Sequence, residues 1–278
     1  MRKILNPGTM EKIWGDKALR EDDVVVATFA KSGTNWTLQI CQQASHYGEA
    51  EFEHIHDLVP WPEAPVPGIV KLHDTKPIDT SPTGIRVIKT HLPAELLPYN
   101  EKTKFITVIR DPKEVCVSAY HFMLGVMGIK DKVTPAEWFE LFLEKNGLGT
   151  EWVKHTAGLW AWRERPNVYT VTYSEMKKNS EVCIRKMVEL LGVELTHAQF
   201  EKVLKRSHVS HMKANESQFA PPKFPLVKPG TKMIRRGEAG SSGELLTEEQ
   251  QKKIDAFAIE QLKALGSDFP YEELFLTH

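Results

Sequence analysis

A short loop after an apolar run carries the residues best suited to holding an anion. Residues 24–29 read VVVATF, which is typical of a strand buried on both faces, and Lys31, Ser32, Gly33 and Thr34 follow closely. Beyond the loop, apolar residues recur at helical spacing, so backbone N–H groups and the positive end of a helix dipole gather there. These residue types predict a cradle for phosphate or sulfate. The alternative is an N-capped helix that happens to follow a lysine.

The sequence IRDPKEVCVS supplies a second candidate anion site. Arg110 ends an expected strand, Asp111 fits the N-cap of the next helix, and Ser118 lies two turns into that helix. Arg110 and Ser118 can therefore reach one anion, and arginine suits phosphate because its planar fork donates two hydrogen bonds. The alternative is a solvated surface pair of Arg110 with Asp111 or Glu114.

Two further segments bring positive charge to the same chemistry. In KTHLP, Lys89 and His91 are two residues apart at a strand end and point to one side, which suits charge stabilisation and proton transfer. In a segment rich in glycine and lysine, Arg235, Arg236 and Gly237 form a basic tip suited to closing over a phosphate. A structural histidine and a solvated charge run are the respective alternatives.

An alternation of strands and helices must position these clusters. We expect strands at 24–29, 85–92, 104–111 and 167–173, with helices at 34–48, 112–122, 134–145, 151–163, 196–207 and 247–266 and a long one ending at Leu191. This pattern predicts an α/β fold with a P-loop-like central parallel sheet flanked by helices, which binds ligands at the carboxyl edge of the sheet. Prolines leave no regular element at 59–84, and 214–244 is also irregular, so we expect one domain over 1–278 with these two loops.

Bulk composition excludes several classes of protein. The formal net charge is −1, which argues against a protein that coats nucleic acid or a membrane. Cys41, Cys116 and Cys183 lie far apart without metal spacing, as expected of buried thiols in a reducing compartment. The sequence shows neither a signal peptide nor an apolar run of about 18 residues, so we expect a cytoplasmic protein.

The order and spacing of the anion motifs resemble those of the cytosolic sulfotransferase family, from about residue 24 to 240. That family transfers a sulfuryl group from 3′-phosphoadenosine 5′-phosphosulfate (PAPS) to a hydroxyl or amine, leaving adenosine 3′,5′-bisphosphate (PAP), and works without metal. The resemblance implies that the 5′-phosphosulfate is bound by Lys31, Ser32, Gly33, Thr34, Asn35 and Trp36, and the 3′-phosphate by Arg110 and Ser118. It also implies cofactor contacts from Tyr173 in TYSEMKKN, Ser207 in RSHVSHMK, and Arg235, Arg236 and Gly237.

The same resemblance implies a mechanism of in-line displacement at sulfur. KTHLP matches the family's catalytic segment without a change, so His91 is expected to act as general base. Lys31 and Lys89 would balance the charge that develops on the sulfuryl oxygens and the leaving phosphate. Ser118 would steer Lys31 away from the cofactor until an acceptor binds.

The acceptor pocket has weaker signals. We expect a small hydrophobic acceptor such as a phenol or alcohol, with candidate walls at Trp61, Leu72, Phe122, Met123 and Met127. Ordinary core packing is the alternative for each of these side chains.

Two other functions remain open. A P-loop kinase would need a late lysine after a glycine run and an acid for magnesium, and the sequence shows neither. A binding module without catalysis would have no need for Lys89 and His91. Where the family has Asp-Trp this chain has Ser241 and Ser242, and of its dimerisation segment only Thr247 is kept, so we expect a monomer or weak homodimer.

Overall fold

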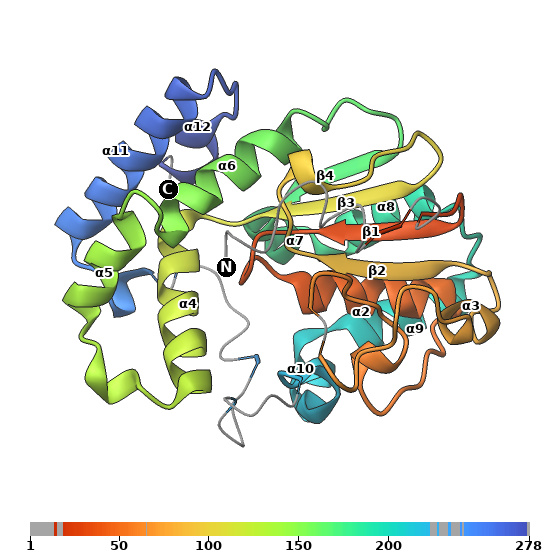
Figure 1. Ribbon diagram of the computed structural model, residues 1–278. Helices are drawn as coiled ribbons and strands as arrows, with labels where there is room; N and C mark the ends of the chain where they lie inside the picture. The colour runs from red at the N-terminus through yellow and green to blue at the C-terminus, as the bar shows by residue number, and fades with distance from the viewer. Residues whose placement is uncertain are drawn as a thin grey trace.

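A four-stranded parallel sheet organises the protein. The computed structural model describes residues 14–15, 19–64, 66–222, 227, 233–234, 240 and 242–276. The strands are β1 (Asp23–Ala27), β2 (Arg86–Thr90), β3 (Lys104–Ile109) and β4 (Val168–Thr172), in the order β2-β1-β3-β4. Val25 pairs with Ile88 on one side and with Phe105 on the other. The predicted α/β fold with a central parallel sheet is therefore confirmed (Figure 1).

Helices surround this sheet in the described part of the chain. They are α2 (Thr34–Ser45), α3 (Lys76–Asp79), α4 (Pro112–Met127), α5 (Pro135–Leu143), α6 (Leu148–Trp160), α7 (Tyr173–Lys178), α8 (Ser180–Leu191), α9 (His197–Ser207), α10 (Val209–Ala214), α11 (Glu248–Ala264) and α12 (Tyr271–Phe275). None of the helices in these residues is long and apolar enough to cross a membrane.

The alternation of side chains along β1 divides the core between the two faces of the sheet. Val24 and Val26 pack into a cluster with side chains of α2, α8 and α9. Val25 and Ala27 point the other way, into a cluster that includes Leu159 near the end of α6. Both faces of β1 are thus buried, as its uninterrupted apolar sequence predicts.

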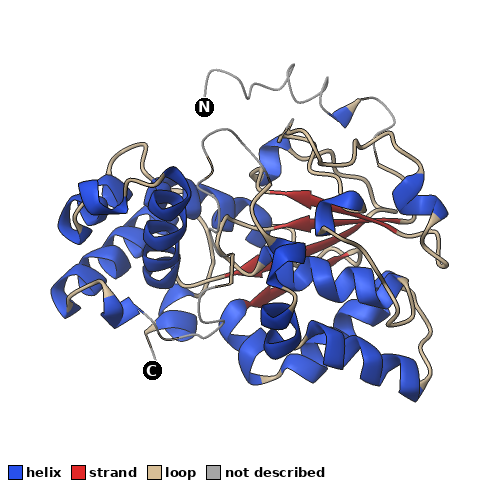
Figure 2. Ribbon diagram, turned by 90° about the horizontal axis from the view of Figure 1, so that it is seen from below, coloured by secondary structure: helices blue, strands red, loops and turns tan. Residues whose placement is uncertain are grey.

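A separate group of helices packs to one side of the sheet. Helices α4, α5, α6 and α11 share a core cluster in which Trp152 and Phe142 are almost fully buried. Figures 1 and 2 show this group beside the sheet, with α4 leading directly from β3. This packing fixes the start of α4 and, with it, the position of Arg110 between β3 and α4.

Local sequence signals set most element ends. The Asp111 carboxylate accepts a hydrogen bond from the Lys113 N–H at the start of α4, and Thr134 and Thr247 form capping boxes with Glu137 and Gln250. The expected single helix after β4 is wrong, because α7 and α8 are separated at Asn179. Gly192, in the left-handed conformation, ends α8 after Leu191, the predicted last residue of the helix.

The proline-rich segment 59–84 is not entirely irregular. The short helix α3 begins inside it, which corrects the expectation of no regular element. Pro77 lies in the first turn of α3, where a missing N–H removes no intrahelical hydrogen bond. The second irregular segment, 214–244, contains the 3₁₀ turns Glu216–Phe219 and Ser242–Glu244 among its described residues.

Candidate functional site

The loop joining β1 to α2 combines positive φ angles with unpaired donors. Lys31 has φ 70°, and Gly33, the N-cap residue of α2, has φ 93°. A Cβ at Gly33 would lie 2.8 Å from Tyr173 Cδ2, so only glycine fits without a shift. The hydroxyl of Ser32 is buried and has no hydrogen-bond partner in the described part of the chain. A lone buried hydroxyl at a helix start, where N–H groups lack intrahelical acceptors, fits an anionic ligand.

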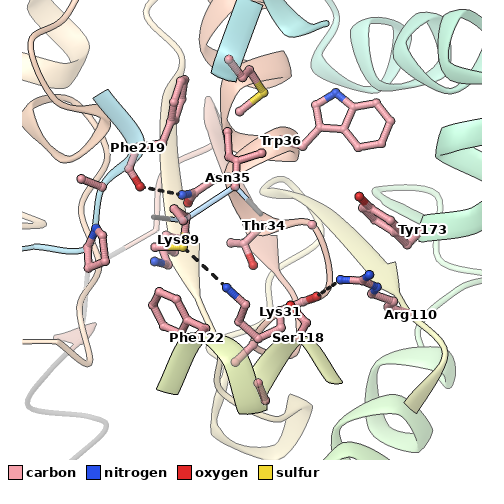
Figure 3. Close-up of a pocket in the computed structure, with 18 of the residues that line it drawn as sticks. Lys31, Thr34, Asn35, Trp36, Lys89, Arg110, Ser118, Phe122, Tyr173 and Phe219 are labelled. Atoms are coloured by element: carbon pink, nitrogen blue, oxygen red, sulfur yellow. Dashed lines mark hydrogen bonds between the residues drawn. The ribbon is translucent and has the colours of Figure 1, made fainter. Parts of the chain in front are cut away.

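The first two residues of α2, which follow this loop, are held by the protein itself. The hydroxyls of Thr34 and Thr28 lie 2.6 Å apart. Asn35 Nδ2 donates to the Phe219 carbonyl oxygen at 3.2 Å, across the site (Figure 3). The loop is therefore tied to the irregular segment at its far wall.

Arg110 lies beneath this loop. One Nη donates to the Lys31 carbonyl oxygen at 2.9 Å (Figure 3), and Nε donates to Glu114 Oε2 at 2.8 Å. The guanidinium carbon is 4.5 Å from the centre of the Tyr173 ring. The pair with Glu114 is buried, with the two side chains 10% and 8% exposed, so the alternative of a solvated surface pair is wrong. The remaining Nη group makes no hydrogen bond to the described residues and is available to a ligand.

An aromatic wall adjoins the arginine. The rings of Trp36 and Tyr173 meet edge to face, with centroids 5.9 Å apart. The Trp36 indole nitrogen and the Ser207 hydroxyl are buried without partners among the described residues, and both side chains line the cavity. Flat rings beside unpaired donors suit the base and sugar of a nucleotide.

His91 directly follows β2 and has a defined tautomer. Its Nδ1 lies 2.8 Å from the Thr28 carbonyl oxygen, which only accepts, so Nδ1 carries the proton. Nε2 therefore presents a lone pair, and the residue lines the cavity. Burial, with the charges of Lys89 and Lys31, holds the pKa of His91 well below its ordinary value, which keeps the imidazole neutral.

Lys89 lies next to this histidine on β2. It is 5% exposed, and its Nζ lies 3.6 Å from the centre of the Trp61 ring. Burial lowers the pKa of Lys89 to about 7, against the opposing charge of Glu63. A buried amine of such pKa in a cavity is typical of functional sites.

Two residues beside Lys89 escaped prediction from the sequence. Glu63 Oε1 accepts hydrogen bonds from the His91 N–H at 2.6 Å and the Thr90 hydroxyl at 3.1 Å. His56 stacks on Trp61 with centroids 5.8 Å apart, and burial lowers its pKa to about 3. Neither residue belongs to a recognisable motif. The proximity of Glu63 to His91 depends on the path of the proline-rich segment.

Lys31 extends over the opposite side of the cavity. Its Nζ lies 3.7 Å from Met233 Sδ and 3.7 Å from the centre of the Phe122 ring (Figure 3). Ser118 lines the same cavity from α4. Lys31 and Lys89 thus both line the cavity that His91 also lines.

One cavity of about 1210 Å³ joins these groups. Among the residues singled out from the sequence, it is lined by Lys31, Gly33, Thr34, Asn35, Trp36, Trp61, Lys89, His91, Arg110, Ser118, Phe122, Met123, Tyr173 and Ser207. Ser32, Leu72 and Met127 are not among the lining residues. Leu72 is 5% exposed in the core cluster under β2, and Met127 ends α4 with 46% exposure. Apolar character alone could not distinguish these two from wall residues.

The basic tip predicted at Arg235, Arg236 and Gly237 lies outside the described residues. The nearby Gly240 N–H donates to Glu114 Oε1, so Glu114 contacts both Arg110 and this part of the chain. Among the described residues, no cluster of three or more His, Cys, Asp or Glu could hold a metal ion.

Comparison with known proteins places this arrangement in a family. The model of the sulfotransferase domain matches residues 21–266. Sulfotransferase 2A1 of Homo sapiens is 29% identical over 272 residues, covering 95% of this chain and 93% of that protein. Sulfotransferase 1C2 of Oryctolagus cuniculus is 27% identical over 264 residues, covering 91% of this chain and 87% of that protein.

Solved structures share the fold. Retinol dehydratase in complex with retinol and PAP superposes with a TM-score of 0.70 at 22% identity, over 91% of this chain and 84% of that one. Mouse sulfotransferase SULT7A1 complexed with PAP gives a TM-score of 0.68 at 23% identity, over 94% of this chain and 90% of that one. Because the family model spans most of its length, the chain belongs to the sulfotransferase family.

Proposed function

We propose that this member of the sulfotransferase family transfers the sulfuryl group of PAPS to a hydroxyl or amine of a small hydrophobic acceptor, with His91 as general base. The observation that carries the proposal is the His91 tautomer. Because Nδ1–H donates to the Thr28 carbonyl, Nε2 is the accepting nitrogen and belongs to a residue lining the cavity. A neutral imidazole held in this way can take a proton from an acceptor hydroxyl.

The unpaired donors of the site fit a doubly anionic nucleotide. The Ser32 hydroxyl and the start of α2 would hold the 5′-phosphosulfate, together with Lys31 and the backbone around Gly33. The free Nη of Arg110 and the Ser118 hydroxyl would hold the 3′-phosphate. The aromatic and hydroxyl groups of Trp36, Tyr173 and Ser207 would contact the adenosine. These assignments fit the sequence resemblance, which also predicts contacts from Arg235, Arg236 and Gly237.

PAPS supplies an activated sulfuryl group, which we propose is transferred by in-line displacement without a metal. The chain supplies proton transfer and charge. The lone pair on His91 Nε2 accepts the acceptor's proton, and the ammonium groups of Lys31 and Lys89 counter the negative charge gathered in the cavity. The Ser118 hydroxyl, on the same wall, is proposed to control the position of Lys31.

The walls of the cavity support a hydrophobic acceptor. Phe29, Trp61, Phe122, Met123 and Leu148 line it with apolar surface. Lys89 is covered by the Trp61 ring and Lys31 contacts the Phe122 ring, so the two cations border an apolar space. A phenol or aliphatic alcohol suits such walls. We further propose that the protein is cytoplasmic and a monomer or weak homodimer.

Binding and turnover test the proposal together. Titration calorimetry should show tight PAP binding in EDTA and only poor ATP binding in magnesium buffer without EDTA, and radiolabelled PAPS should label phenols or alcohols. Tight metal-dependent binding of ATP would instead favour a kinase, and PAP binding without any transfer would favour a binding module.

For a competent acceptor, we expect His91→Ala to lower kcat by about 10²–10⁴-fold, because a general base contributes about that much. His197→Ala, at an exposed position on α9, is the matched control and should retain turnover. Near wild-type turnover of His91→Ala would exclude His91 as the base.

A further inference from the structure

The carboxylate of Glu63 contacts the catalytic edge from a segment remote in sequence. Its Oε1 accepts from the His91 backbone N–H at 2.6 Å and from the Thr90 hydroxyl at 3.1 Å. Burial raises the pKa of Glu63, and the two hydrogen bonds to Oε1 oppose that shift because they favour the carboxylate form. Glu63 thus holds the main chain at the end of β2, where Thr90 is followed by His91.

The ammonium of Lys89 stands in unusual surroundings. It is almost fully buried against the Trp61 ring, and it makes no hydrogen bond or salt bridge to the described residues. The ionisable groups around Lys89 are Glu63, His56 and His91. Lys31 and His155 also affect the pKa of His91, and His54 affects the pKa of His56. Of these, Glu63 alone brings a negative charge to Lys89. All the others are cationic or become so when protonated.

We infer that Glu63 is a positioning residue for sulfuryl transfer, which anchors the main chain at His91 and keeps the buried Lys89 ammonium charged. The inference rests on the proposed function, because Glu63 acts through the proposed roles of His91 and Lys89. We assign Glu63 itself no contact with the acceptor or the nucleotide. It acts through two groups that do border the cavity. A purely structural carboxylate would serve the first role but not the second.

The two roles can be separated because Gln keeps an acceptor oxygen and loses the charge. Burial lowers the pKa of Lys89 to about 7, and the negative charge of Glu63 opposes that shift. Removing the charge should lower the pKa of Lys89 further, by about one unit or more, since a close opposite charge moves a pKa by about 1–3 units. The ammonium is present below its pKa and lost as pH rises through it.

The test is the pH profile of kcat/KM for PAPS, which reports ionisations of the free enzyme. The wild type should lose activity as pH rises through about 7. In Glu63→Gln the alkaline midpoint should fall by about one unit, so that at pH ~8 kcat/KM is about tenfold below wild type, with the gap narrowing as pH falls. Arg is not deprotonated in proteins, so Lys89→Arg should remove the alkaline midpoint, and adding Glu63→Gln to it should shift nothing. Glu53→Gln, at an exposed position nearby, should follow the wild type.

A second measurement does not need turnover. The Lys89 Cε and Nζ signals in NMR spectra of the ligand-free protein, assigned with Lys89→Arg, should titrate at lower pH in Glu63→Gln than in the wild type. An unchanged Lys89 titration, or a loss of kcat/KM that is equal at every pH, would overturn the inference. If the wild type transfers no sulfuryl group while the Lys89 titration still shifts, the proposed function fails and the electrostatic role of Glu63 stands.

Discussion

The buried pair of Arg110 and Glu114 makes the contribution of Arg110 to stability separable from its proposed role in ligand binding. In Arg110→Met, Glu114 is left buried without its cation, because its side chain is only 8% exposed. Removing one partner of a buried ion pair costs about 3–5 kcal/mol, so Arg110→Met should lower the free energy of unfolding by that amount. Adding Glu114→Gln removes the unpaired charge and should restore most of the loss.

Affinity for PAP should behave differently from stability. Hydrogen bonds to charged groups contribute about 1.5–3 kcal/mol, so losing the free Nη should weaken PAP binding by about 10–100-fold in both the single and the double variant. Urea unfolding gives the stabilities and calorimetry gives the affinities. If the double variant bound PAP like the wild type, Arg110 would not hold the ligand. Equal instability of the two variants would refute the account of the buried pair.

Two further substitutions test the loop and the core. Gly33→Ala should weaken PAP binding and lower stability, because its Cβ would lie 2.8 Å from Tyr173 and its φ is 93°. Gly68→Ala is the control for the backbone angle alone, since Gly68 has φ 88° and nothing lies within 4 Å of its Cβ. Equal losses of stability in the two variants would contradict the clash with Tyr173. Burial lowers the pKa of His155 to about 3, so the unfolded chain takes up the proton first and stability should fall as pH drops from 6.5 toward 3. Thermal melts at several pH values give the slope of the free energy of unfolding against pH. In His155→Phe this slope should fall by up to about 1.4 kcal/mol per pH unit, and an unchanged slope would show that another group causes the dependence.

Local signals in the sequence sufficed for most of the fold. The apolar run before Lys31 indicates a central strand, and the sequences at Thr134 and Thr247 form capping boxes at the starts of α5 and α11. Such features act over a few residues, so no tertiary information is needed to see them. The break at Asn179 was missed because apolar periodicity continues through it and the turn depends on how α7 packs after β4.

The candidate site divides in the same way. Lys31, Lys89, His91 and Arg110 could be singled out because parallel strands bring their carboxyl ends to one edge of the sheet. Leu72 could not be told from a wall residue, because an apolar side chain near a cavity and one in a core look alike in sequence.

The amino-acid sequence by itself determined which side chains are available for chemistry: those of a loop suited to an anion, an arginine, a lysine and a histidine, each at or near the end of an expected strand. Only the tertiary structure decided their protonation and their neighbours. The tautomer of His91 depends on a carbonyl 63 residues away in the chain, at Thr28, and the charge beside Lys89 comes from Glu63. Both effects arise from burial and from contacts between distant segments, which act through space and leave no local pattern in the chain.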